Sequence, residues 1–190
     1  MAISVRKTGG LSADGVKVLV YGQAGAGKTS LIKTLPQPIV LSAEGGLLSI
    51  QDADVPFIEI NGMDTLKEAY VWLTESAEAK QYKSVALDSI SEIAEVVLNH
   101  EKKVAKDPRQ AYGALAEKMT DLIRAFRDLP GRNVYFSCKQ ERAKDEQSGA
   151  MLYYPAMPGN MLKQGVGYFF DEVMALRVEK DADGNPTLKR

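Results

Sequence analysis

One glycine-rich segment constrains the fold of this chain more than any other feature of its sequence. Residues 22–29 read Gly-Gln-Ala-Gly-Ala-Gly-Lys-Thr and match the pattern G-x-x-x-x-G-K-[ST]. A short apolar run at residues 16–21 precedes the segment, and a helical pattern that ends at Pro36 follows it. A strand, a glycine loop and a helix in this order are the context that a phosphate-binding loop (P-loop) requires. The sequence therefore predicts a P-loop.

The residue types in this loop suit a nucleoside triphosphate. Glycines let the backbone turn tightly so that successive N–H groups converge on phosphate oxygens, and the helix that follows adds the positive end of its dipole. Lys28 is expected to reach the β and γ phosphates, and the Thr29 hydroxyl is expected to ligate Mg²⁺. The predicted nucleotide-binding residues are Gly22, Gln23, Ala24, Gly25, Ala26, Gly27, Lys28, Thr29 and Ser30.

Strands and helices alternate along the rest of the chain. Strands are predicted at residues 16–21, 39–41, 57–60, 85–87, 133–137 and 172–178. Helices are predicted after the P-loop, at residues 64–80 with Asp64 as N-cap, from about residue 90, and from residue 115 to a stop at Gly131. The alternation favours an α/β fold with a mainly parallel central sheet and helices on both faces. Residues 16–190 are expected to form one domain with a C-terminal β-hairpin, preceded by residues 1–15 as a candidate edge strand or oligomer contact.

Composition excludes several classes of protein. The 190 residues contain 24 Lys and Arg against 25 Asp and Glu, so the chain lacks the strongly basic balance of a whole-surface nucleic-acid binder. The single Cys cannot form an internal disulfide. No charged and apolar leader is visible, and no apolar run approaches the roughly 20 residues that a bilayer requires. We expect a cytoplasmic protein without membrane contact.

Two acids at predicted strand ends are candidates for the metal and the water of a hydrolytic reaction. Asp88 closes the strand at residues 85–87 and is predicted to hold Mg²⁺ through water; a cap on the next helix is the alternative. Hydrolysis also needs a carboxylate that orients or deprotonates the attacking water. In AAA+ and ABC-type enzymes an acid directly follows the Asp that holds Mg²⁺, but here Ser89 follows Asp88. The candidate is therefore the next strand-end acid, Glu44, for which a solvated loop position is the alternative.

Taken in order, these features resemble the RecA superfamily of P-loop ATPases, in which the catalytic Glu closes the strand after the P-loop helix. Further matches to the RecA core are Asp88-Ser89 before a long helix, residues 112–119, residues 136–140 and residues 158–163. The small size makes the chain most similar to the phage RecA-core single-strand annealing proteins of the Sak type. It departs from RecA at Ser137-Cys138, where RecA has Asn-Gln, and in lacking RecA's amino-terminal helix, which argues against long filaments.

The resemblance implies an ATP-binding factor of phage homologous recombination that binds single-stranded DNA and promotes annealing or strand pairing. ATP and Mg²⁺ are the implied cofactors, hydrolysis to ADP and phosphate the implied reaction, and the host cytoplasm the implied location. Self-association into a ring or filament is implied as well, and a single-strand-binding protein is a further candidate partner. Lys28 and Glu44 are the implied catalytic residues, with either Lys139 or Gln140 as the γ-phosphate sensor.

The resemblance also places two DNA-binding loops, at about residues 99–112 and 140–160. Their candidate contacts are Lys102, Lys103, Lys106, Arg109, Tyr112, Arg142, Lys144, Tyr153 and Tyr154. Bases stack on aromatic faces for about 1–3 kcal/mol each, and the modest charge of each loop would sum in an assembly. The alternatives are a solvated helix face for the first cluster and a packed hairpin strand for the two later tyrosines.

Assembly would also bring a cation from one protomer to the γ phosphate of the next. The candidates are Lys163, Arg177, Lys189 and Arg190.

Other functions of a P-loop domain are weighed against this one. A regulatory or scaffolding switch would use the same ATPase and direct the loops to protein partners. A GTPase would need an N-K-x-D motif, which residues 138–141 do not supply. A small-molecule kinase would need an arginine-rich lid, and the second loop has only Arg142.

Overall fold

The structure is a computed structural model, and it describes residues 15–145 and 148–179. The strands are β1 (Lys17–Gly22), β2 (Pro38–Ser42), β3 (Phe57–Glu59), β4 (Ser84–Asp88), β5 (Asn133–Lys144), β6 (Met151–Pro155) and β7 (Glu172–Leu176). The helices are α1 (Lys28–Leu31), α2 (Met63–Glu75), α3 (Ile90–Val104), α4 (Pro108–Arg127) and α5 (Asn160–Gly165). Short 3₁₀ turns are η2 (Ile32–Thr34), η3 (Leu47–Ala53), η4 (Glu78–Gln81) and η5 (Val166–Phe169).

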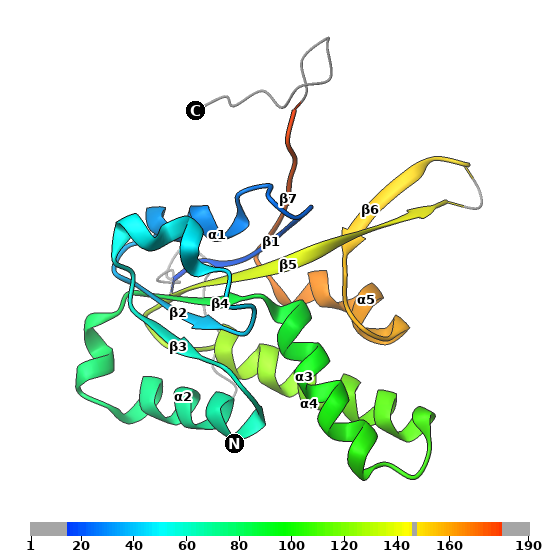
Figure 1. Ribbon diagram of the computed structural model, residues 1–190, viewed down its shortest axis with the longest axis horizontal. Coiled ribbons are helices and arrows are strands. Elements are labelled where there is room, and N and C mark those ends of the chain that lie inside the picture. Colours follow the sequence, from blue (N-terminus) through cyan, green and yellow to red (C-terminus); the bar gives the residue numbers. More distant parts are fainter. Residues whose placement is uncertain (1–14, 146–147, 180–190) are drawn as a thin grey trace, which may run out of the picture.

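The strands form one sheet in the order β3-β2-β4-β5-β1-β7, with every neighbouring pair along this path parallel. β6 leaves this path and pairs antiparallel with the second half of β5, so the two strands project from the body as a hairpin (Figure 1). The predicted α/β fold with a mainly parallel sheet is confirmed. Because parallel strands end at the same edge, the carboxyl ends of β1, β2, β4 and β5 meet there, which is where ligands bind in such folds.

Both faces of the sheet are covered. One face packs against α1 and η3 through a small apolar cluster that includes Val20, Val40 and Ile50. The other face packs against α2, α3 and α4 through a larger cluster around Leu87 and Phe136 (Figure 1). Buried strands with apolar side chains on both faces explain why β2 and β4 appear as continuous apolar runs in the sequence.

The predicted boundaries of α2 are wrong at both ends. The N-cap is Gly62 rather than Asp64, which lies in the first turn. The helix stops at Glu75 because Ser76 adopts an extended backbone, with ψ at 135°. The apolar spacing that suggested a longer helix continues into the separate turn η4, where Ala79 is fully buried.

The polar stretch between the two long helices is more ordered than a loop. α3 continues to Val104, and α4 begins at Pro108 after Asp107, whose carboxylate accepts a hydrogen bond of 3.0 Å from the backbone N–H of Gln110. α4 then ends at Arg127, earlier than the stop predicted at Gly131. The region expected to be the first DNA-binding loop therefore consists of the end of α3, a short connection at residues 105–107 and the start of α4.

The second expected loop is mostly the β5–β6 hairpin, because β5 runs to Lys144 instead of ending at Ser137. β7 ends at Leu176, two residues earlier than predicted. Residues 1–14, which hold nearly all of the predicted N-terminal segment, and the second arm of the predicted C-terminal hairpin lie outside the described residues. Within the part that is described, no helix has both the length and the apolar character needed to cross a bilayer.

Candidate nucleotide-binding site

The P-loop joins the end of β1 to the start of α1 at the carboxyl edge of the sheet. Gly25 and Gly27 have φ angles of 73° and 96°, a conformation that favours glycine. A Cβ built on either residue meets nothing within 4 Å, so this side of the loop faces open space. The loop is therefore shaped as a cradle with room for an anion beside its backbone.

Lys28 begins α1 and lies back across the loop. Its ammonium donates hydrogen bonds to the carbonyl oxygens of Gly22 at 2.9 Å and Gln23 at 3.0 Å. The hydroxyl of Tyr135 on β5 donates to the Lys28 carbonyl at 2.8 Å and anchors the start of the helix. Burial, reinforced by the charge of Asp88, raises the pKa of Tyr135, so this hydroxyl keeps its proton and remains a donor.

Asp88, at the end of β4, receives hydrogen bonds on both carboxylate oxygens. The Thr29 hydroxyl donates to Oδ2 at 2.8 Å, and the Ser137 hydroxyl on β5 donates to Oδ1. Only 2% of Asp88 is exposed, so these two hydroxyls replace the water that the carboxylate gives up on folding. Thr29 and Asp88, the two predicted metal ligands, are thus brought together.

Glu44 follows β2 and is held from the adjacent strand end. The Ser89 hydroxyl donates to Glu44 Oε1 at 2.6 Å, and the ammonium of Lys139 lies 3.8 Å from the same oxygen. Lys139 also forms an ion pair with Glu92 in the first turn of α3. The structure therefore brings two of the candidate catalytic residues, Glu44 and Lys139, close to the predicted metal ligand Asp88 at one edge of the sheet.

Gln140, the other candidate sensor, points to a different place. It lines a cavity of about 260 Å³ together with Gln23, Tyr153 and Arg177. Its side-chain oxygen is buried and has no hydrogen-bond partner in the described residues. Lys139 is therefore paired with acids beside Glu44, whereas Gln140 lies beside Gln23 of the P-loop, so the two candidate sensors lie in different surroundings.

Sequence reasoning missed four residues that complete this site: Ser89, Glu92, Tyr135 and Ser137. Ser137 could have been found, because it lies on the strand next to Asp88 and is a polar residue inside a buried apolar run. Tyr135 stands two positions earlier on the same strand and faces α1. The roles of Ser89 and Glu92 depend on how the β2 loop meets α3, which has no local sequence signal.

The family model described as AAA domain matches residues 14–189, nearly the whole chain. The chain belongs to the AAA domain family. Its fold is similar to a prototypical ATPase from the type III secretion system of pathogenic bacteria, with a TM-score of 0.56 and 10% sequence identity. That alignment covers 86% of this chain and 52% of the other, so the AAA domain spans about half the length of that ATPase. No curated protein matches the chain.

These comparisons confirm the α/β fold of a P-loop NTPase and an AAA domain over nearly the whole chain. The narrower resemblance to Sak-type annealing proteins is not tested by these matches and stays a prediction. A P-loop domain of this family takes a nucleotide together with Mg²⁺.

The site fits both ligands on its own geometry. The open side of the glycine cradle accommodates phosphates, and a hydroxyl and a carboxylate 2.8 Å apart are the hard oxygen ligands that Mg²⁺ prefers. Among the described residues, no group of three or more His, Cys, Asp or Glu side chains could hold a metal. Beside a nucleotide, Mg²⁺ is usually held by one or two protein groups plus phosphates and water, and Thr29 and Asp88 are two such groups.

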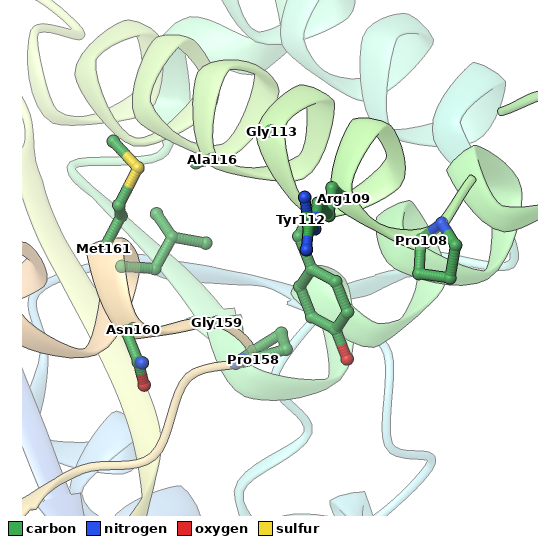
Figure 2. A pocket seen from close by; sticks show the side chains of 10 residues that line it. Pro108, Arg109, Tyr112, Gly113, Ala116, Pro158, Gly159, Asn160 and Met161 are labelled. Atoms are coloured by element: carbon green, nitrogen blue, oxygen red, sulfur yellow. The ribbon is translucent and has the colours of Figure 1, made fainter. Parts of the chain in front are cut away.

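Two of the predicted DNA contacts of the first region, Arg109 and Tyr112, line a groove between α4 and α5. Figure 2 shows Tyr112 on α4 pointing toward the segment of Pro158 and Gly159 that leads into α5, with Arg109 beside it on the same helix. The groove measures about 670 Å³. Tyr112 is 42% exposed, and the Lys102 ammonium at the end of α3 lies 5.9 Å from the centre of its ring. Lys103 shares the last turn of α3, and Lys106 lies in the connection to α4.

The predicted contacts of the second region, Arg142, Lys144, Tyr153 and Tyr154, all lie on the β5–β6 hairpin. Tyr153 packs under the guanidinium of Arg177, 5.0 Å from its ring centre, so the packed-hairpin alternative describes this residue.

The predicted trans-acting cations fall in different places. Arg177 lies beside the P-loop of its own chain, and Lys163 on α5 pairs with Glu141 at the base of the hairpin. Lys189 and Arg190 lie outside the described residues.

Proposed function

We propose that this AAA domain is an Mg²⁺-dependent ATPase that binds single-stranded DNA and promotes annealing or strand pairing in phage homologous recombination. The DNA-binding part of the proposal rests on the α4–α5 groove, where the half-exposed ring of Tyr112 lies beside Lys102 and Arg109. The site carries the ATPase part, because the P-loop, the predicted metal ligands and Glu44 meet at one edge of the sheet.

In this proposal each residue of the site has a separate role in hydrolysis. The loop amides and Lys28 bind the phosphates, and Lys28 exchanges its two carbonyl partners for phosphate oxygens. Thr29 and Asp88 would hold Mg²⁺, which when bound would neutralise negative charge on the phosphates.

Glu44 orients the attacking water and accepts its proton as the oxygen–phosphorus bond forms and the bond to the bridging oxygen breaks, which gives ADP and phosphate. Lys139 and Gln140 are the candidates to contact the γ phosphate.

The groove suits an unstacked base with its phosphates. The ring of Tyr112 offers a stacking face worth about 1–3 kcal/mol per base. Lys102 and Arg109 lie beside that ring. The two nearby acids are already engaged: Glu101 is buried and paired with Lys118, and Asp107 caps α4. The rim therefore presents its cations to a polyanion without competition from these carboxylates.

The test is the binding of a fluorescently labelled single-stranded oligonucleotide, measured by anisotropy with and without ATP and over a range of salt. Tyr112→Ala should weaken binding about 5-fold to 150-fold through lost stacking, and Arg109→Ala should lower the slope of log affinity against log salt by about 1. Tyr168→Ala is the matched control, since Tyr168 is 91% exposed and lies outside the groove. Wild-type protein that binds no oligonucleotide would refute the proposal.

One observation favours a second function, a regulatory ATPase whose groove binds a protein. Met161 at the rim of the groove is 76% exposed, and an exposed methionine suits an adaptable apolar interface. Salt separates the two functions, because counterion release weakens DNA binding steeply while a largely apolar protein interface changes little.

A further inference from the structure

Ser89 occupies a rigid position between the predicted metal ligand and the predicted catalytic base. It follows Asp88 directly, is fully buried, and forms the N-cap of α3, where its hydroxyl accepts a hydrogen bond of 3.4 Å from the backbone N–H of Glu92. α3 is itself anchored by buried residues along its length, including Ile93 and Val97. The Ser89 hydroxyl is therefore fixed by the body of the domain.

Glu44, in contrast, lies on a segment with little support of its own. Gly45 follows it with a φ of 65°, and a Cβ built on Gly45 or Gly46 would meet nothing within 4 Å. The backbone is held one residue earlier, where the N–H of Ala43 donates to the Asp88 carbonyl at 3.0 Å. The direction of the Glu44 side chain thus depends on what its carboxylate contacts.

Two groups contact that carboxylate, and both approach Oε1. The Ser89 hydroxyl is at hydrogen-bond distance, 2.6 Å, whereas the Lys139 ammonium at 3.8 Å makes only an electrostatic contact and is half-exposed. Glu92 competes for the same ammonium through its own ion pair. Ser89 is therefore the only direct hydrogen-bond donor to the Glu44 side chain that the described residues provide, and its geometry leaves Oε2 for water.

We infer that Ser89 is a positioning residue, which aims the Glu44 carboxylate at the attacking water and keeps it from turning toward Lys139. This inference rests on the ATPase activity proposed above. Ser89 itself contacts neither water nor phosphate in this role, so its removal should lower kcat and leave nucleotide affinity unchanged.

The experiment compares ATP hydrolysis and nucleotide binding by Ser89→Ala, Ser89→Thr and the control Ser84→Ala. Ser84 is an equally buried serine at the other end of β4, where its hydroxyl donates to the Pro36 carbonyl. We expect Ser89→Ala to lower kcat about 10-fold to 100-fold, part of what a general base contributes. The dissociation constant for a fluorescent ATP analogue should stay within about twofold, and threonine, which keeps the hydroxyl, should restore most of kcat. Ser84→Ala should leave kcat unchanged.

A double-mutant cycle with Glu44→Gln separates positioning from a merely structural role. If Ser89 acts through Glu44, adding Ser89→Ala to Glu44→Gln causes no further loss of kcat. Losses that multiply in the double variant, or a Ser89→Ala protein with full kcat, would overturn the inference while leaving the ATPase proposal intact. Failure of the wild-type protein to hydrolyse ATP would instead overturn the proposed function.

Discussion

Gly22 stands where β1 becomes the P-loop, and replacing it with alanine should disturb both. A Cβ on Gly22 would lie 2.5 Å from the carbonyl oxygen of Leu176, its register partner on β7. Real Cβ contacts essentially never fall below 3.0 Å, so β1 and β7 would have to separate by about half an ångström, against a backbone atom that cannot rotate away. Overpacking of this kind costs about 1–3 kcal/mol.

Two matched variants distinguish the stability cost of steric overlap from the cost of an unfavourable backbone conformation. Gly25→Ala has open space but requires a positive φ, and should cost about 1–2 kcal/mol. Gly46→Ala has open space and a φ of −81°, which suits any residue, and should be neutral or stabilising by about 0.4–1 kcal/mol.

Thermal unfolding of the full chain measures these differences. A chain of this size shifts by about 2–4 °C for each kcal/mol, so Gly22→Ala should unfold about 2–12 °C lower than the unmodified protein. If Gly22→Ala and Gly46→Ala unfold at the same temperature, the close approach of β1 and β7 is wrong.

Three further predictions test other parts of the account. Asp88→Asn should abolish the Mg²⁺ dependence of nucleotide binding, measured by titration with and without the metal, because it removes the negative charge of the predicted metal ligand beside Thr29. Unchanged dependence would place the metal elsewhere. Burial raises the pKa of the Cys138 thiol to about 11, so iodoacetamide at pH 8 should modify this thiol only after unfolding. The folded state should also lose stability as the pH rises from 9 toward 11, because the thiol of the unfolded chain ionises in this range and the buried thiol does not. Rapid labelling of the native protein would contradict that burial. Lys118→Met should destabilise the domain by about 1–3 kcal/mol in urea unfolding, because Glu101 would remain 5% exposed without its ammonium partner; no change would show that the pair contributes nothing.

The sequence predicted the parts of the site that are encoded locally. The glycines before Lys28 need a tight turn with positive φ, and a continuous apolar run ending in Asp88 is typical of a strand buried on both faces. Both signals lie within a few residues of the groups that they identify. The alternation of such runs with helical periodicity was enough to predict the parallel sheet.

The rest depends on contacts between distant segments. Ser89 meets Glu44 across 45 positions of the chain, and Ser137 meets Asp88 across 49. Pairings of this kind arise from the order of strands in the sheet, which short-range patterns do not carry. The same holds for the groove, since Tyr112 and Asn160 come together only when α5 packs beside α4.

Boundary errors had local causes. Buried Ala79 continued the apolar spacing of α2 beyond its end, and the polar composition around Asp107 concealed a capped helix start. In the β5–β6 hairpin, the polar half of β5 resembled a loop because that half leaves the main sheet and pairs only with β6.

The central claim is that the site binds a nucleoside triphosphate, with the loop backbone and Lys28 on the phosphates and Thr29 and Asp88 at the metal. Calorimetric titration of the full chain with ATP and Mg²⁺ tests it most directly, with Lys28→Ala compared with Lys33→Ala, a lysine that pairs with Asp52 outside the loop. The account predicts one site per chain in the unmodified protein and in Lys33→Ala, and no measurable binding by Lys28→Ala. Equal affinity in Lys28→Ala and the unmodified protein would contradict it.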